Sequence, residues 1–272
     1  MEKLKLHTGY SNILAKNDTY KTPEEVKKNS FLPLSFRFYP KLVKLFLYAN
    51  KLTKSNEYDR YNWVATSKAI LDILEEVGIK FEITGMKNLT SFEGPAIFIG
   101  NHMSTLETVI LPYIINPVKP VVFVTKEELN STPVFGPINA ARHPILVGRN
   151  NARADLMKVM EQGAERIKNG RSIIIFPQRT RSPKFDARSF NSLGIKLARK
   201  NNVPVVPVAL LTDAWGNGKI IKDFGKIDSN KIVHFAFGRP IKVTGNGSEQ
   251  HEKVIEFIIS KLKEWGREDL TP

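Results

Sequence analysis

Residues 95–115 read "PAIFIGNHMSTLETVILPYII", and this stretch decides the fold class. Its first six residues are a short apolar run typical of a buried strand, and a helical pattern follows from about Thr105 to Ile115. Similar apolar runs occur at "KFEITG", "PVVFVT", "HPILVG", "RSIIIF", "VPVVPVAL" and "KIVHFAFG", with further helical patterns near residues 152–168, 189–200 and 250–265. Doubly apolar strands that alternate with helices predict an α/β fold, in which helices flank a mostly parallel central sheet.

The first 78 residues differ from this alternating pattern and predict an N-terminal helical hairpin. One helix begins near Pro40, because proline suits the first position of a helix. A second spans about residues 58–77 and ends at Gly78, a natural C-terminal cap. We therefore divide the chain into a helical, membrane-associating segment at residues 1–78 and an α/β domain at residues 79–272.

The helix that begins near Pro40 carries apolar residues on one side and lysines on the other. The apolar residues at helical spacing are Leu42, Leu45, Phe46, Ala49 and Leu52, and the lysines are Lys41, Lys44 and Lys51. A short basic amphipathic helix is what an interfacial membrane anchor needs. The same pattern is equally typical of a helix packed on its own domain. The sequence leaves both interpretations open.

The charge of the chain points to an anionic partner. Lys and Arg number 41 against 27 Asp and Glu, and the net charge of +14 favours nucleic acid, an acidic membrane surface or an acidic carrier protein. We find no signal-peptide pattern and no apolar run of about 18 residues, so we expect a peripheral protein on the cytoplasmic side of a membrane, without a transmembrane span. The chain has no cysteine, which excludes disulfides and a cysteinyl intermediate.

Functional side chains in such sheets gather where strands end, and "NHMSTLE" at residues 101–107 lies at such a point. Ser104 and Glu107 have the spacing of a capping box, in which the serine oxygen accepts from the Glu107 amide and the glutamate reaches back to the Ser104 amide. His102 precedes this cap and can meet Glu107 because it lies outside the helix. Glu107 then holds one imidazole nitrogen as N–H and leaves the other to accept a proton. From these residues alone, a structural cap and a catalytic pair both stay open.

Two further polar clusters follow predicted strands and contain arginine. Arg149 comes after "HPILVG", and Arg179 and Arg181 lie in "FPQRTRS". A guanidinium is well suited to phosphate recognition, although most loop arginines are solvated or paired at the surface. The histidines show no ligand spacing, so we predict no metal site.

Together these clusters resemble the four motif blocks of the glycerolipid acyltransferases of phospholipid biosynthesis, typified by lysophosphatidic acid acyltransferase. The blocks stand here as "HMSTLE", "TPVFGPINAARHPILVGR", "FPQRTRS" and "VPVVPV", in the order of the family and within residues 95–210. The resemblance implies that residues 79–272 are an acyltransferase domain. It also implies an N-terminal helical segment that seats the protein on a membrane with anionic lipids.

The resemblance implies a role for each matched residue. His102 corresponds to the general base that takes the proton of the acceptor hydroxyl, and Glu107 to the carboxylate that orients this base. The positions expected to hold the phosphate or the acceptor are Arg149, Gln178, Arg179, Thr180 and Arg181, and residues 203–208 are expected to line the hydrophobic side. Because no protein nucleophile takes part, acyl transfer from acyl-CoA or acyl carrier protein to a lysophospholipid is expected to be direct and to need no cofactor.

Three residues depart from the family pattern. The orienting carboxylate is usually Asp, and Glu107 is one methylene longer. Gln178 and Arg179 replace a usual Glu-Gly pair, which makes the acceptor pocket more positive by about two unit charges. An acceptor more anionic than lysophosphatidate, or one without phosphate, is therefore a live hypothesis. The alternatives are an acyl hydrolase, a non-catalytic lipid-binding relative, or a nucleic-acid-binding protein, although no nucleic acid is expected because the chain has no RNA-binding block or zinc finger.

Overall fold

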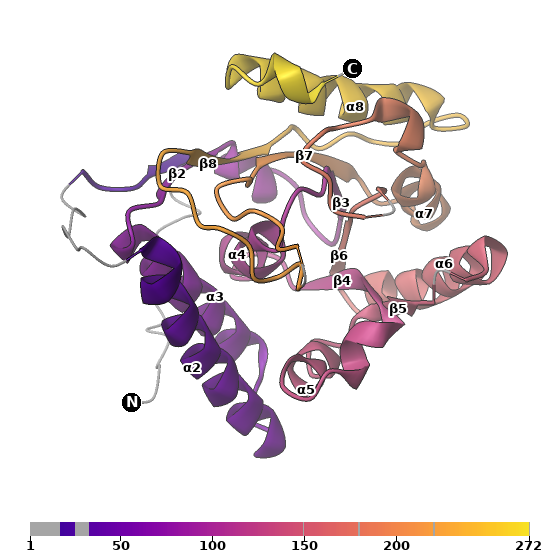
Figure 1. Cartoon of the computed structure of the whole chain (residues 1–272). Coiled ribbons are helices and arrows are strands. Elements are labelled where there is room, and N and C mark those ends of the chain that lie inside the picture. The colour runs from indigo at the N-terminus through magenta and orange to yellow at the C-terminus, as the bar shows by residue number, and fades with distance from the viewer. Residues whose placement is uncertain (1–16, 25–32, 149, 179, 220, 272) are drawn as a thin grey trace.

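A computed structural model describes residues 17–24, 33–148, 150–178, 180–219 and 221–271 (Figure 1). Across these residues one eight-stranded sheet forms the centre, with the strand order β1-β2-β8-β7-β3-β6-β4-β5. The strands are β1 (Thr19–Lys21), β2 (Lys80–Thr84), β3 (Ile97–Gly100), β4 (Val121–Lys126), β5 (Ile145–Val147), β6 (Ser172–Ile175), β7 (Val205–Leu211) and β8 (Ile232–Phe237).

Most neighbouring strands are parallel, as the sequence predicts. The pairs β2·β8, β3·β6, β3·β7, β4·β5 and β4·β6 are parallel, whereas β1·β2 and β7·β8 are antiparallel. Each of the seven predicted runs overlaps one of the strands β2 to β8, and β4 and β7 extend one residue past their runs. Strand β1 was not predicted, because its three residues are polar and it pairs only along the edge of the sheet.

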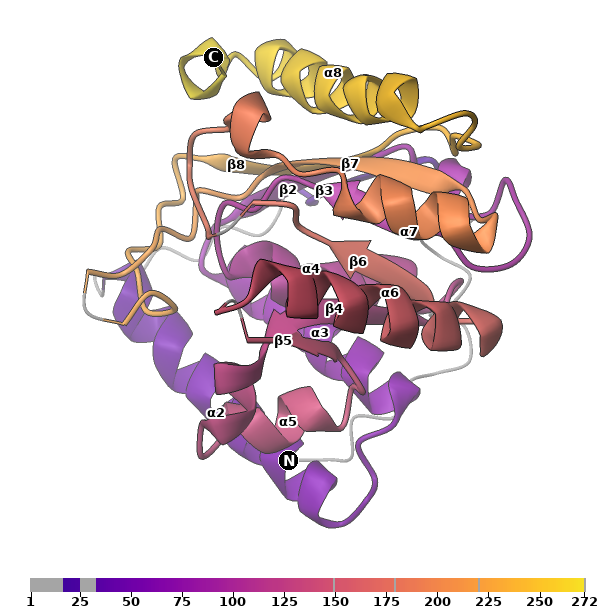
Figure 2. The ribbon, with the colours of Figure 1, turned by 90° about the vertical axis from the view of Figure 1, so that its right-hand side faces the viewer.

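Helices cover both faces of the sheet (Figures 1 and 2). They are α2 (Leu34–Lys54), α3 (Arg60–Glu76), α4 (Leu106–Ile115), α5 (Phe135–Ala140), α6 (Ala152–Lys168), α7 (Leu193–Asn201) and α8 (Ser248–Glu264). In β3, Phe98 packs in the core shared with α2, α3 and α4, whereas Ile97 and Ile99 pack in the core shared with α6, α7 and α8. Both faces of the strand are therefore buried, which explains its unbroken apolar run.

The N-terminal helices pack on each other and share a core with the sheet. Helix α2 begins at Leu34, so the prediction that Pro40 occupies the first helical position is wrong, and this proline lies inside the helix. Its missing N–H costs the hydrogen bond to the Phe36 carbonyl, which the tertiary contacts of α2 offset. One such contact joins the rings of Phe38 and Trp215, whose centroids are 4.8 Å apart.

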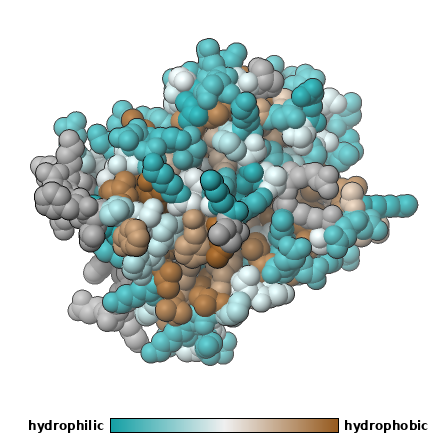
Figure 3. Space-filling model, in the orientation of Figure 1, coloured by the Kyte–Doolittle hydropathy of each residue, from teal (hydrophilic) through white to brown (hydrophobic). Residues whose placement is uncertain are grey.

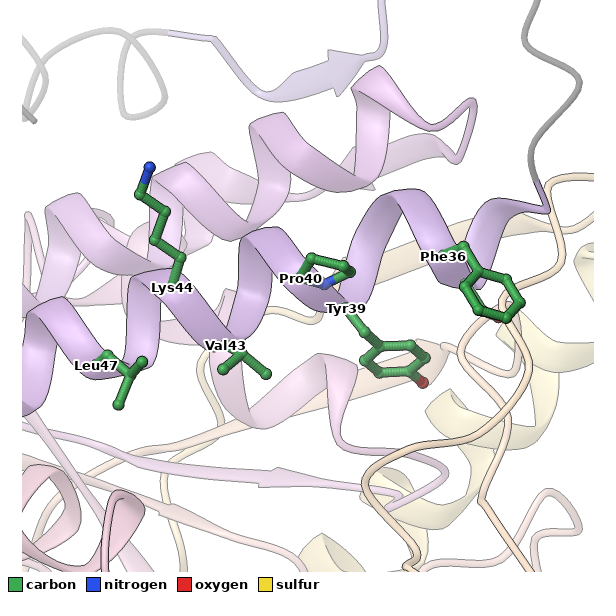
Figure 4. Close-up of a pocket in the computed structure, with 7 residues that line it drawn as sticks. Phe36, Tyr39, Pro40, Val43, Lys44 and Leu47 are labelled. Carbon is green, nitrogen blue, oxygen red and sulfur yellow. The ribbon is translucent and has the colours of Figure 1, made fainter.

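The apolar residues that the sequence offered as a membrane anchor face the protein instead. Leu42, Leu45, Ala49 and Leu52 are buried in the core, and Phe46 is partly buried against it. A different set of residues forms what we call the outer side of α2, namely Phe36, Val43 and Leu47, which are exposed, and Tyr39, which is half-buried (Figure 4). Within the described residues, no helix combines the length and the apolarity needed to cross a bilayer.

Candidate active site

The loop between β3 and α4 carries the first polar cluster and is held at both of its ends. Asn101 follows β3 and is buried; its side-chain amide donates to the Leu210 carbonyl at 2.8 Å and its oxygen accepts from the Leu210 amide at 2.9 Å. This pair of bonds ties the loop to strand β7. The next residue, His102, is therefore held at a fixed position beside the carboxyl ends of parallel strands.

Glu107 lies in the first turn of α4 and is fully buried. Its Oε1 accepts from the backbone amides of Met103 at 2.6 Å and Ser104 at 2.9 Å. Its Oε2 accepts from the Thr212 hydroxyl at 2.6 Å. Burial by itself would raise the pKa of Glu107, but the hydrogen bonds that it accepts, led by that of His102, hold this pKa below its usual range.

His102 contacts this carboxylate directly. Its Nδ1 lies 2.8 Å from Glu107 Oε1, and its side chain is 15% exposed. The ring stacks on that of Phe176, with centroids 4.5 Å apart. An ionised Glu107 can only accept, so the proton of the neutral imidazole sits on Nδ1. Nε2 is left as the nitrogen that can take a proton from a bound hydroxyl.

Ser104 takes part in the cap and in the network around Glu107. Its backbone amide donates to Glu107 as predicted, but its hydroxyl oxygen accepts from the Leu106 amide at 3.1 Å rather than from the amide of Glu107. The hydroxyl is buried, 3.0 Å from both Glu107 Oε2 and the Thr212 carbonyl. The same hydrogen bonds thus cap helix α4 and orient His102. The Ser104 hydroxyl is buried in this network and is not placed to act as a nucleophile.

The loop after β6 forms hydrogen bonds with the backbone of His102. Gln178 is buried, and its side-chain oxygen accepts from the His102 amide at 2.6 Å. The Ser182 amide donates to the His102 carbonyl at 2.9 Å. Gln178 therefore contacts the backbone of the histidine loop, which a glutamine at this position can do without bringing a negative charge.

Arg181 is brought to the same rim and has an anionic partner. Its Nη1 lies 2.6 Å from Asp223 Oδ1 and also bonds the Thr105 hydroxyl. Thr180 is exposed, and its hydroxyl lies 3.3 Å from Lys222 Nζ. The two other arginines of the prediction, Arg149 and Arg179, lie outside the described residues.

Two residues that contribute to this site were not predicted from the sequence. Thr212 follows the last residue of β7 directly, so the rule that site residues follow strand ends could have found it. Asp223 lies farther along the same connection to β8, where no periodicity or motif marks it. Residues 203–208, expected to line the hydrophobic side, lie largely in the buried centre of the sheet in β7.

In the part of the chain that the structure describes, no group of three or more histidine, aspartate or glutamate side chains is placed to hold a metal ion. The expectation that the site works without a metal or cofactor stays a prediction. The groups on hand are a buried carboxylate, an oriented imidazole and a paired guanidinium, which together suit proton abstraction beside an anionic group.

Comparison with known proteins finds a family model that matches the central part of the chain. Residues 80–211 match the family model described as Acyltransferase. This segment is therefore similar to the acyltransferase family. The acyltransferase domain so defined includes the histidine loop and all four motif blocks, whereas α2, α3, α8 and Asp223 lie outside it.

Curated relatives of this acyltransferase domain carry one name. A 1-acyl-sn-glycerol-3-phosphate acyltransferase of Pseudomonas aeruginosa is 34% identical over 132 residues, covering 48% of this chain and 49% of that protein. A chloroplastic 1-acyl-sn-glycerol-3-phosphate acyltransferase of Arabidopsis thaliana is 30% identical over 142 residues, covering 52% of this chain and 38% of that protein. The matched part therefore spans about half or less of the length of these relatives.

The fold around the acyltransferase domain also has a solved counterpart. The crystal structure of the 1-acyl-sn-glycerophosphate (LPA) acyltransferase from Thermotoga maritima superposes with a TM-score of 0.67 at 20% identity, covering 86% of this chain and 95% of that one. The match extends beyond residues 80–211, so the N-terminal or C-terminal helices also take part in the likeness. It supports the predicted α/β fold.

Proposed function

We propose that this protein transfers a fatty acyl group from acyl-CoA or acyl carrier protein to the free hydroxyl of a lysophospholipid. The observation that carries this proposal is the contact of 2.8 Å between His102 Nδ1 and the fully buried carboxylate of Glu107. The names of the curated relatives support the class of reaction and point to lysophosphatidate, 1-acylglycerol 3-phosphate, as the first acceptor to test.

In the proposed reaction His102 acts as the general base. Nε2 takes the proton of the acceptor hydroxyl while the oxygen attacks the thioester carbon, so that a C–O bond forms and the C–S bond breaks. The departing thiolate then receives the proton from the imidazolium. Glu107 keeps the imidazole in the correct tautomer and stabilises its charge during the transfer.

The acceptor phosphate would be held by the cationic rim of the site. Arg181 points its guanidinium at Thr105 and Asp223, beside the histidine loop. Lys222 adds a second cation next to Thr180. Arg149 and Arg179, which match or replace family positions, are proposed to contribute to the same phosphate. Gln178 is assigned to the support of His102 rather than to the acceptor.

We further propose that the outer side of α2 rests on a membrane surface with anionic lipids. Phe36 is 73% exposed, Val43 41% and Leu47 54%, and Lys44 lies beside them. Figure 3 shows hydrophobic residues gathered on the face where α2 lies in Figure 1. Apolar side chains beside lysines suit the boundary between headgroups and acyl chains. A lipid acceptor would then reach the site from the membrane.

The outer side of α2 is joined to the site through the loop that carries Asp223. Phe224 is 47% exposed, and its ring lies 5.0 Å from that of Tyr39 on α2. The Tyr39 hydroxyl donates to the Gly225 carbonyl. The outer side of α2 thus contacts the same loop that carries Asp223, the partner of Arg181.

The test is a mass-spectrometric transfer assay with purified protein, liposomes, palmitoyl-CoA or palmitoyl carrier protein, and a panel of lysophospholipids. We expect a diacyl product from one acceptor, and a loss of about 10²-fold or more in His102→Ala. Equal turnover in a folded His102→Ala preparation would contradict the mechanism. Free fatty acid without a diacyl product would favour a hydrolase, and salt-sensitive binding to DNA but not to anionic liposomes would favour a nucleic-acid-binding protein.

A further inference from the structure

A cavity lies at the other end of the parallel strands from His102. Its volume is about 280 Å³, and it is lined by residues from the start of α3, the end of α4, the loop before β5 and the starts of β4 and β6. Pro120 and Arg171 precede their strands, whereas His102 and Gln178 follow the ends of strands that run in the same direction. The cavity is therefore separate from the acceptor rim described above.

We propose that this cavity binds the phosphate group of a small phosphorylated molecule or of a lipid headgroup. The first observation is its charge. Arg60, Arg142 and Arg171 all line it, and across the described residues none of the three forms an ion pair with a carboxylate. The lining carboxylate, Asp59, accepts from the Asn62 amide at 2.8 Å as the cap of α3.

The positive charges around the cavity also affect the pKa of His143, which lines it. Burial and then the charges of Arg171 and Arg166 hold the pKa of His143 below its usual value. His143 adopts a left-handed backbone conformation with φ 52°, which is unusual for a residue with a side chain. A cluster of like charges without counter-charge is costly in the empty protein, and an anion removes that cost.

The second observation is a set of buried donors without acceptors. Trp63 Nε1, Asn116 Nδ2 and Arg142 Nε have no hydrogen-bond partner among the described residues, and all three belong to residues that line the cavity. Trp63 is 4% exposed and Asn116 1% exposed. A buried N–H left unsatisfied destabilises the folded state, and all three groups are donors. The ligand that satisfies them is an acceptor, which a phosphate is and a cation is not.

The cavity is also held in shape before any ligand arrives. The Arg142 guanidinium lies 5.0 Å from the Trp63 ring centroid and donates from Nη2 to the Tyr58 hydroxyl at 3.0 Å. Arg60 donates from Nε to the Asn116 carbonyl at 2.8 Å. Pockets for drug-sized ligands measure roughly 300–1,000 Å³. A smaller cavity with fixed walls fits a phosphate group with a compact organic part or a headgroup, rather than an acyl chain.

Arg171 is the residue to change first. Within the described residues its side chain makes no hydrogen bond or ion pair, so replacing it breaks none. Inorganic phosphate is titrated calorimetrically into wild-type protein, Arg171→Gln, and two variants with the same loss of charge elsewhere. Arg181→Gln removes the cation of the acceptor rim, and Lys253→Gln removes an exposed lysine of α8. We expect Arg171→Gln to weaken phosphate binding about tenfold or more, and the Arg181→Gln and Lys253→Gln proteins to retain this component.

Binding to vesicles distinguishes a lipid headgroup from a soluble phosphorylated molecule. Tryptophan emission gives an independent measure of phosphate binding. Loss of binding to vesicles containing phosphatidylglycerol in Arg171→Gln, beyond that in Lys253→Gln, assigns a headgroup; loss confined to inorganic phosphate assigns a soluble ligand. We also expect phosphate to change the tryptophan emission in wild-type protein and not in Trp63→Phe. Phosphate and vesicle affinities equal in Arg171→Gln and wild type would overturn the proposal. Because no step uses acyl transfer, this result is independent of the proposed enzymatic function.

Discussion

The carboxylate of Glu107 is shared between a helix cap and His102, the proposed general base. It accepts from the amides of Met103 and Ser104 at the start of α4, and from Nδ1 of His102 in the preceding loop. The extra methylene relative to aspartate still allows a contact of 2.8 Å with the ring. The same bonds that begin the helix therefore fix the direction of the imidazole.

Replacing this carboxylate by an amide tests that arrangement. Glu107→Gln keeps the size of the side chain but brings a donor where only acceptors fit, so the imidazole loses its fixed tautomer. We expect kcat for acyl transfer to fall by about 10²–10⁴-fold with little change in KM. Steady-state kinetics measure the effect. Glu107→Asp is the matched control, and a similar loss in both variants would show that reach, rather than charge, matters.

Asp223 forms an ion pair with Arg181, whose guanidinium is proposed to bind the acceptor phosphate. The ion pair with Arg181 has one partly exposed member, since Asp223 is 48% exposed, so it is worth about 0.5–1 kcal/mol. We expect Asp223→Asn to lower KM for lysophosphatidate about two- to fivefold, because the phosphate no longer competes with a carboxylate. A monoacylglycerol, which has no phosphate, serves as the control acceptor. An equal change in KM for both acceptors would contradict this role.

At the scale of single residues, the sequence predicted the pair of His102 and Glu107 because both lie in one short segment after a strand. It did not predict Thr212 or Asp223, since these residues reach the site only through the pairing of β7 with β3 and through a long loop. It assigned Gln178 to the acceptor, whereas its side chain bonds the His102 backbone. Spacing along the chain reports neighbours in sequence and not the direction of a side chain.

Among the elements, α2 shows what periodicity can and cannot decide. The helix has two apolar stripes, one buried through Leu42 and Leu45 and one exposed through Val43 and Leu47. The sequence identified the helix and left open whether the more regular stripe meets a membrane or packs on the domain; this stripe packs in the core. Strands such as β3, β6 and β7 were easier to predict, because both of their faces are buried. The edge strand β1 has no such signal.

A change on the outer side of α2 tests its proposed contact with lipid. In Val43→Gln/Leu47→Gln, two exposed apolar side chains become polar without a change of charge, so we expect vesicle affinity to fall about tenfold or more. Binding is measured by sedimentation with vesicles of phosphatidylglycerol. Met157→Gln, at a residue of α6 that is 64% exposed, is the control and should bind as wild type does. Wild-type affinity in the double variant would argue against this surface.

On the scale of the whole molecule, a charge network joins the end of β7 to the C-terminal part of the chain. Asp213 Oδ2 lies 2.8 Å from Lys231 Nζ and 2.9 Å from Arg267 Nη1. Farther on, the Phe185 amide donates to the Leu270 carbonyl at 2.7 Å. The segment after α8 is thereby tied both to the sheet and to the loop that follows Arg181.

This network predicts a dependence of stability on pH. Burial alone would raise the pKa of Asp213, but Lys231 and Arg267 hold it below its usual value. The stability it contributes is therefore present above the pKa of the unfolded chain, near 4, and is lost as the pH falls through the lower pKa of the folded state.

The variant Asp213→Asn removes this contribution. We expect the free energy of unfolding at pH 7 to fall by about 2 kcal/mol and Tm to fall by about 4–8 °C. The difference in Tm between pH 7 and pH 3 should be smaller than in wild type. Thermal unfolding at the two pH values measures both effects. Asp186→Asn, at an exposed pair with Arg188, is the control. An unchanged pH dependence in Asp213→Asn would assign the acid sensitivity to other carboxylates.

The loop at residues 213–226 has a consequence for protein engineering. It lies outside the acyltransferase domain at residues 80–211, yet it supplies the partner of Arg181, and it donates from Asn217 to the Met103 carbonyl at 2.9 Å. In the proposed mechanism the proton-transfer pair and Arg181 thus lie inside this domain, whereas the carboxylate that pairs with Arg181 comes from the segment that follows it. Exchanging this loop between relatives would be a route to new headgroup preferences that leaves the proton-transfer pair unchanged.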